Sequence, residues 1–368
     1  MARKRKITLK KQETKFDFGL FFLVIGLTLL GVLMVYNASV AEALRDFGDK
    51  YHYLKSQAVW AGLGLLLMVI VSFIDYRLIS RLSPFLFFIN LILLVLVLIP
   101  GVGMEIKGAR RWLDLKVISL QPTELIKLTF SLYLAAWLSK KRSFWQLLFL
   151  LALMLALIIL EPDLGTAVVV VTTAFLIYFI SGASWYHLLP ISLAGIATGL
   201  WVILSSPYRR KRLLTFLDPT SDPLGSSYHI RQVIIALGSG GLFGLGLGQS
   251  RQKYEYLPEA ATDSIFAIIA EETGFIGGFL VILALFIVIY KGFRIAIQGP
   301  DLFAKLAGGG IASWLGIQTA VNLAAMVALV PLTGLPLPFF SYGGSSLIVS
   351  LTGVGILLNI SRHRVIKK

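Results

Sequence analysis

Acidic side chains stand at the ends of several long apolar runs in this sequence. Asp263 precedes an apolar run that ends in the adjacent pair Glu271 and Glu272. A carboxylate in such a place can take a proton from a substrate hydroxyl within about 3 Å. It can also cap a helix, which contributes ~1 kcal/mol. The spacing leaves both roles open for Asp263, whereas at least one of the two glutamates must face a protein interior.

Two further acidic motifs lie at similar boundaries. In "QPTELIKL", Pro122 suits a helix start, and Glu124 and Lys127 share a helical face because they are three residues apart. We expect the two charges to neutralise each other, either as a structural ion pair or in the wall of a polar cavity. In "EPDLGT", helix capping explains Asp163 but not Glu161.

Basic residues gather near these motifs. The segment "YRRKRLL" contains Arg209, Arg210 and Arg212 beside aromatic and apolar residues. This mixture is typical of a membrane interface, where long side chains reach phosphate groups. Arg110 and Arg111 form a second group. Such cations can bind an anionic ligand, and snorkelling to the interface explains them equally well.

Composition identifies an integral membrane protein. The 368 residues are 57% hydrophobic and 14% charged, with a mean hydropathy of +0.82, whereas soluble domains are about 25% charged. A spanning helix needs ~20 mostly apolar residues. We predict ten spans, at 18–36, 57–74, 84–100, 122–138, 143–160, 165–181, 186–204, 263–290, 303–330 and 340–360.

The expected fold class is an all-α polytopic membrane protein. A basic tail at 1–17 and a short tail at 363–368 flank one transmembrane domain at 18–362. Because more Lys and Arg fall on the side of the termini, the positive-inside rule predicts that both termini are cytoplasmic. A large extracytoplasmic loop, 205–262, is then expected between helices 7 and 8. It should contain a short amphipathic helix that presents Ile230, Val233, Ile234 and Leu237 on one face.

Composition also excludes several classes of function. The sequence has no cysteine, which excludes disulfides and thiolate metal sites, and its four histidines are scattered. The net charge of +15 is divided between two membrane faces without a nucleic-acid motif, so no nucleic-acid partner is expected. The glycine-rich "GSGGLFGLGLG" lacks the Lys-Ser/Thr pair of a P-loop and indicates flexibility or close backbone packing. Polar and Gly/Pro-rich loops on the outer side indicate one outward-facing site.

Six motifs occur in order along most of the chain, namely "GARRWLDL", "QPTELIKL", "EPDLGT", "LLTFLDPTSDPLGSSYHIRQ", "YLPEAATDSIFAIIAEE" and "GLPLPFFSYGGSSL". Together they resemble the SEDS family (shape, elongation, division and sporulation), which includes FtsW, RodA and SpoVE. The compact "GQSRQKYEYLPEA" is closest to the FtsW division branch. The family usually reads close to "PEAHTDFIF", whereas Ala261 and Ser264 replace its histidine and phenylalanine here. This difference concerns the shape of an acceptor pocket, because Asp263 is retained.

The resemblance implies a peptidoglycan glycosyltransferase that polymerises lipid II on the outer face of the cytoplasmic membrane, in cell division or cell-shape maintenance. C1 of a MurNAc joins the 4-hydroxyl of a GlcNAc with inversion, and Asp263 matches the essential aspartate of the family. A class B penicillin-binding protein and other division or elongation proteins are the implied partners. A divalent cation, Mg or Mn, can assist such a reaction, but no ligand set is legible. Candidate substrate-binding residues are Arg209, Arg210, Arg212, Lys127, Glu124, Arg110, Arg111, Glu161, Ser341 and Ser345.

Two other classes of function stay open at this point. A lipid II flippase or transporter would also use many helices, buried acids and broken "LPLPFF" segments. Polar features gathered at one face, rather than at the midplane, favour the enzyme. A scaffold without catalysis is the third possibility, and the retained Asp263 argues against it.

Overall fold

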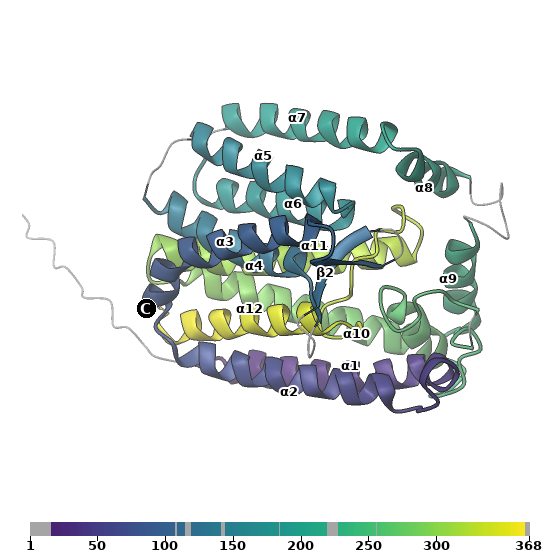
Figure 1. Ribbon diagram of the computed structural model, residues 1–368. Helices are drawn as coiled ribbons and strands as arrows, with labels where there is room; N and C mark the ends of the chain where they lie inside the picture. The colour runs from purple at the N-terminus through teal and green to yellow at the C-terminus, as the bar shows by residue number, and fades with distance from the viewer. Residues whose placement is uncertain are drawn as a thin grey trace, which may run out of the picture.

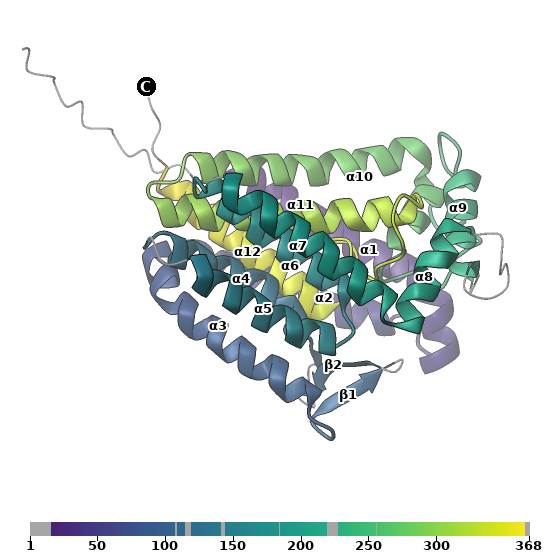
Figure 2. The same cartoon turned by 90° about the horizontal axis from the view of Figure 1, so that it is seen from above.

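The computed structural model describes residues 16–106, 109–114, 119–140, 144–183, 185–218, 227–254 and 256–364. Most of the expected basic tail and the last four residues lie outside these ranges. The described chain is a bundle of long helices with a small sheet beside the end of α3 (Figures 1 and 2). The helices are α1 Phe18–Phe47, α2 His52–Phe73, α3 Tyr76–Leu98, α4 Pro122–Leu138, α5 Phe144–Leu160, α6 Leu164–Ile180, α7 Trp185–Leu204, α8 Pro207–Leu217, α9 Tyr228–Ser239, α10 Ile265–Ile297, α11 Leu302–Met326 and α12 Gly344–Arg362.

Each predicted apolar run falls on one of these helices. Within the described part of the chain, α1, α2, α3, α10 and α12 are long and apolar enough to cross a membrane. The apolar helices α5 and α6 have 17 residues each. The fold is therefore that of a polytopic helical membrane protein, and the count of ten spans stays a prediction.

Several predicted boundaries were wrong, because helices continue beyond the apolar residues. Polar residues expected in a loop after residue 36 extend α1 to Phe47, where Gly48 ends the helix with a φ of 68°. Helix α3 begins at Tyr76 behind the cap Asp75 and contains Pro84, which was expected near its start. A helix end that projects from hydrocarbon into water can carry polar side chains without cost. Hydropathy alone therefore shortens the expected helices.

The amphipathic helix in the long loop exists as α9, but its buried face differs from the prediction. Ile230 and Val233 are buried as expected, together with Ala236. Ile234 is 48% exposed. The buried positions follow a three-residue spacing, so the face rotates away from Ile234.

A three-stranded antiparallel sheet was not predicted by the all-α assignment. Strand β1 (Gly103–Ile106) pairs with β2 (Ala109–Asp114), which pairs with β3 (Ser119–Leu120). This sheet connects α3 to α4 (Figure 2). Its central strand carries the two arginines of "GARRWLDL" and therefore fixes where they point.

Helix α11 is surrounded by other helices. It packs against α10, α6, α4 and α12, while α12 also packs against α2. Its glycines allow this close approach: a Cβ added at Gly310 would lie 2.7 Å from Ile177 Cδ1. Polar side chains near the C-terminal end of α11 are consequently buried inside the bundle.

The two ends of the described chain lie side by side. Asp17 caps α1, and its carboxylate lies 2.9 Å from both Lys291 Nζ and Arg364 Nη2. Helices α8 and α9 lie at the opposite end of the bundle (Figures 1 and 2). We call that opposite end the loop end. The two ends of the described chain therefore lie at the same end of the bundle, and the cytoplasmic placement of the termini stays a prediction.

Candidate functional site

The predicted pair on α4 forms a buried ion pair near the start of this helix. Pro122 occupies the first turn of α4, which sets Glu124 and Lys127 on the same face. Lys127 Nζ donates to Glu124 Oε1 at 2.7 Å and to Gln318 Oε1 at 2.8 Å. The two charged residues are only 3% and 2% exposed. The expected neutralisation is confirmed.

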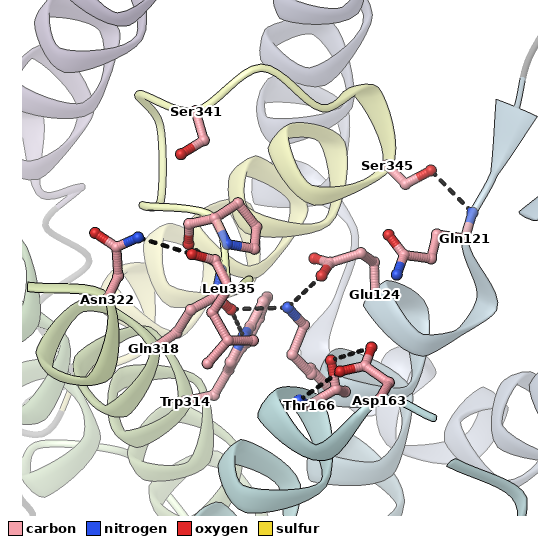
Figure 3. A network of polar contacts seen from close by, with 12 residues as sticks. Gln121, Glu124, Asp163, Thr166, Trp314, Gln318, Asn322, Leu335, Ser341 and Ser345 are labelled. Carbon is pink, nitrogen blue, oxygen red and sulfur yellow. Dashed lines mark hydrogen bonds and ion pairs between the residues drawn. The ribbon is translucent and has the colours of Figure 1, made fainter. Parts of the chain in front are cut away.

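Two amides one turn apart on α11 extend this network (Figure 3). Gln318 Oε1 also accepts from the Trp314 indole at 2.9 Å, and its Nε2 donates to the carbonyl of Pro336 at 2.8 Å. Asn322 Nδ2 donates to the carbonyl of Leu335 at 2.7 Å. We call Glu124, Lys127, Trp314, Gln318 and Asn322 the amide cluster. It ties α4 and α11 to the segment between α11 and α12.

Asp263 is held against the same segment. Its backbone carbonyl accepts from Asn322 Nδ2 at 2.9 Å, and its Oδ1 accepts from the Thr262 hydroxyl at 3.2 Å. A Cβ added at Gly334 would lie 3.9 Å from Asp263 Oδ2, so the segment passes directly beside the carboxylate. The cap position of α10 falls on Ser264. Asp263 thus lies one residue outside the cap position and is half-buried.

The bend at "EPDLGT" lies between α5 and α6. Asp163 caps α6 as predicted, accepting from the backbone N–H of Thr166 at 3.0 Å and from its hydroxyl at 2.9 Å. Glu161 is fully buried, and neither of its carboxylate oxygens has a hydrogen-bond partner in the described structure. Burial and the neighbouring Asp163 raise the pKa of Glu161 to about 9, against a lowering by Arg111.

The candidate arginines differ in their surroundings. Arg111 reaches from β2 to the bend and donates to the carbonyls of Glu161 at 2.8 Å and Pro162 at 2.6 Å. Arg110 instead pairs with Glu105 on the adjacent strand at 3.2 Å. The sheet therefore directs one arginine toward the acidic bend and the other to a local partner.

The arginines of α8 lie at the loop end. Arg212 donates to the carbonyl of Leu332 at 3.1 Å, which brings it to the segment beside Asp263. Arg209 donates to the carbonyls of Val202 at 3.3 Å and Ile159 at 3.4 Å. Arg210 is exposed. The structure thus brings Arg212 toward Asp263 and connects Arg209 to the ends of α5 and α7.

The two candidate serines support the loops around the site. Ser341 Oγ accepts from the N–H of Leu337 at 2.7 Å, which closes a tight turn. Ser345 Oγ accepts from the N–H of Gln121 at 3.1 Å and donates to the carbonyl of Ser119 at 3.3 Å. Both hydroxyls are engaged with backbone groups of the segments that frame the site.

A second buried polar cluster surrounds a break in α10. Gly274 has a φ of 69° inside this helix, two residues after Glu272, and Glu271 and Glu272 are each 1% exposed. Lys253 Nζ donates to Glu272 Oε1 at 3.1 Å and to Asn37 Oδ1 at 2.8 Å. We define the kink cluster as Asn37, Ser250, Lys253, Glu271 and Glu272. Both glutamates face the protein interior, whereas the sequence predicted this for at least one of them.

The glycine-rich loop packs its backbone against this break. A Cβ added at Gly240 would lie 2.2 Å from the carbonyl oxygen of Ala270, and one added at Gly244 would lie 2.1 Å from that of Glu272. Close backbone packing is therefore the role of these two glycines.

Sequence reasoning missed Gln318, Asn322 and Lys253. Gln318 and Asn322 stand four residues apart in the otherwise apolar end of α11. Polar side chains in a membrane helix face the protein interior and mark functional regions, so this spacing could have identified them. Lys253 had no such signal, because its partners come from distant parts of the chain.

These features define a polytopic membrane protein with a polar site at its loop end. Residues 18–366 match the FtsW, RodA and SpoVE family of cell cycle proteins. The chain is 43% identical to stage V sporulation protein E of Bacillus subtilis, with 96% of this chain and 98% of that protein covered. It is 40% identical to the "probable peptidoglycan glycosyltransferase FtsW" of Trichlorobacter lovleyi, with 94% and 93% covered.

Solved structures agree with these sequence matches. A chain of a peptidoglycan synthase complex gives a TM-score of 0.76 at 35% identity, covering 94% of this chain and 98% of that one. The rod shape determining protein RodA of Thermus thermophilus gives 0.70 at 33% identity, covering 96% and 98%. The chain belongs to the FtsW/RodA/SpoVE family. Its relatives include proteins named FtsW and a stage V sporulation protein.

Proposed function

We propose that this protein is a peptidoglycan glycosyltransferase that polymerises lipid II on the outer face of the cytoplasmic membrane. The observation that carries this proposal is the placement of Asp263. Its half-buried carboxylate stands outside the cap of α10 and beside the segment 331–341, and Asn322 holds its backbone. Relatives named peptidoglycan glycosyltransferase support this function.

The proposed reaction transfers the growing glycan from one lipid carrier to a new sugar. The oxygen of the acceptor GlcNAc 4-hydroxyl forms a bond to C1 of the donor MurNAc, and its proton passes to the Asp263 carboxylate. The bond between C1 and the pyrophosphate oxygen breaks, and the electron pair leaves on undecaprenyl pyrophosphate. Attack opposite the leaving group inverts the configuration at C1. A general base of this kind contributes about 10²- to 10⁴-fold to the rate.

Positive charge must stabilise the departing pyrophosphate. Arg212 is our first candidate because it contacts the segment beside Asp263. The other proposed substrate-binding groups are Arg209, Arg210, Lys127, Glu124, Arg110, Arg111, Glu161, Ser341 and Ser345. Glu161 has both oxygens buried without a hydrogen-bond partner in the described structure, which suits a group that meets a polar ligand.

The proposed location is the bacterial cytoplasmic membrane, with both termini in the cytoplasm and the site outside. The likeness to a chain of a peptidoglycan synthase complex supports a class B penicillin-binding protein as partner, and other division or elongation proteins are further candidates. Magnesium or manganese remains a proposal for charge neutralisation. Among the described residues, no three acidic or histidine side chains gather as a metal site, and no step depends on the ion.

The proposal is tested by polymerisation of purified lipid II. Native protein and Asp263→Asn are assayed in detergent, with and without a class B partner. Asparagine keeps the size of the side chain but cannot accept the proton. We expect glycan polymer from the native protein and a rate at least about 10²-fold lower from the folded variant.

Other outcomes would favour the alternatives. Equal polymerisation by both proteins would remove Asp263 from the chemistry. If native protein binds lipid II but makes no polymer with or without the class B partner, a flippase or transporter becomes the better account. Absence of both binding and polymerisation would favour a scaffold.

A further inference from the structure

Asn322 contacts Asp263, whose carboxylate is the proposed base. It also contacts the segment 331–341 beside that carboxylate, which we call the wall. Its Nδ2 donates to the carbonyl of Asp263 at 2.9 Å and to the carbonyl of Leu335 at 2.7 Å. The side chain is 2% exposed. One amide group therefore connects the start of α10 to the segment between α11 and α12.

The second contact matters because the wall passes close to the carboxylate. A Cβ at Gly334, the residue before Leu335, would lie 3.9 Å from Asp263 Oδ2. At Leu335 and Asp263 the backbone is fixed by the same nitrogen. This one side chain therefore helps to fix the distance between wall and carboxylate, beside the hydrogen bond from the N–H of Tyr342 to the carbonyl of Ala261 at 2.8 Å.

Gln318 continues the connection to the ion pair of α4. It lies one turn before Asn322, donates to the next carbonyl of the same segment, at Pro336, and accepts from Lys127 at 2.8 Å. The two amides thus hold consecutive carbonyls, 335 and 336, with Asp263 at one end of the network and Lys127 at the other.

We propose that Asn322 is a positioning residue that sets the orientation of Asp263 relative to the segment 331–341. This inference rests on the proposed function of Asp263 as a base. Asn322 acts through the backbone of Asp263 and Leu335. A misplacement of a reacting group by about 1 Å can cost ~10²-fold in rate. A side chain that fixes the backbone of Asp263 therefore affects the rate of the reaction.

The chain contains a matched control at the opposite end of the bundle. Asn359 on α12 is also fully buried, and its Nδ2 likewise donates to backbone carbonyls, at Val71 and Ser72, at 3.3 and 3.0 Å. The Oδ1 atoms of both asparagines lack a hydrogen-bond partner in the described structure. Removal of either amide leaves buried carbonyls without a donor, but only Asn322 touches Asp263.

The test compares Asn322→Ala with Asn359→Ala in lipid II polymerisation. We expect similar losses of unfolding temperature in detergent. For Asn322→Ala we expect kcat per folded molecule to fall by about 10- to 100-fold with KM changed by less than about threefold. Asn359→Ala should keep kcat within about twofold of the native value.

A second pair of variants keeps the test decisive if the alanine variants do not fold. Asn322→Asp and Asn359→Asp preserve size and, when protonated, supply one donor in place of two. We again expect a lower kcat at position 322 than at position 359, and Asn322→Asp should lower kcat less than Asn322→Ala does. Equal kcat for the two positions, or a change confined to KM at Asn322, overturns the inference. Failure of the native protein to polymerise would instead refute the proposed function.

Discussion

The amide cluster and the kink cluster both bury a lysine–glutamate pair, but they differ in how completely their polar atoms are satisfied. In the kink cluster, Glu272 accepts from Asn37, Lys253 and Ser250. Glu271 accepts from Ser250 and from the N–H of Arg251. Every carboxylate oxygen of Glu271 and Glu272 therefore has a hydrogen-bond partner in the protein.

The amide cluster leaves buried acceptors without partners among the described residues. These are Glu124 Oε2 and Asn322 Oδ1, and both oxygens of the nearby Glu161 share this property. Buried polar groups are normally hydrogen-bonded, and exceptions need a reason. The kink cluster is therefore satisfied within the chain around the break in α10, and we propose that the unpartnered acceptors of the amide cluster meet a polar ligand.

Removal of the kink-cluster cation should have the largest effect on stability. Lys253→Met leaves Glu272 buried without its ion-pair partner, and breaking such a pair costs about 3–5 kcal/mol. Thermal unfolding in detergent should show a large decrease, while turnover per folded molecule stays close to native. A strong loss of turnover with unchanged unfolding would reverse the roles of the two clusters.

Replacement of both partners of each pair separates stability from function. Glu124→Gln with Lys127→Met, and Glu272→Gln with Lys253→Met, each remove a buried pair without leaving a lone charge. We expect both double variants to fold. Polymerisation should fall by about 10²- to 10³-fold only in the first, since Glu124 and Lys127 are among the proposed substrate-binding groups and the second pair is not. A comparable loss in the second would show that the clusters are not distinct.

The buried Glu161 predicts a pH dependence of stability. Its folded-state pKa of about 9 lies above the ordinary value of 4.5. Its stabilising contribution is therefore complete below about pH 4.5 and is lost as pH rises toward about 9, by at most ~1.4 kcal/mol per pH unit. Native protein should unfold at a lower temperature at pH 8 than at pH 6, and Glu161→Gln should reduce this difference. An identical pH slope in the variant would contradict the assignment.

Glycine substitutions should have the smallest effect and test the wall beside Asp263. Gly334 and Gly248 have φ values of 72° and 81°, a conformation that costs a residue with a Cβ about 1–2 kcal/mol. Gly248 has open space around an added Cβ, whereas Gly334 lies against Asp263. Both alanine variants should lose similar stability, and only Gly334→Ala should also lose turnover. Equal turnover would show that the wall does not control the carboxylate.

The sequence was sufficient to predict elements whose cause is local. Apolar runs predicted where helices form, and the three-residue spacing of Glu124 and Lys127 predicted their ion pair. Asp163 was expected to cap α6 for the same local reason. The sheet was missed because strands as short as Ser119–Leu120 have too few residues for a periodic pattern.

Contacts between distant segments could not be predicted from one sequence. Lys253 meets Asn37, which is 216 residues away, and Asn322 meets Asp263, which is 59 residues away. Such pairs depend on how the helices pack, and neither helix periodicity nor capping rules contain that information. The sequence alone also allowed Asp263 as the cap of α10, whereas the structure places that cap on Ser264.

The most direct test of the account measures turnover and thermal unfolding together in Asp263→Asn and Lys253→Met. Asp263→Asn should unfold at the native temperature and yet polymerise lipid II at least about 10²-fold more slowly. Lys253→Met should show the opposite behaviour, with a low unfolding temperature and near-native turnover per folded molecule. If Asp263→Asn loses stability and keeps its turnover, Asp263 is a structural residue and the division of roles between the two regions is wrong.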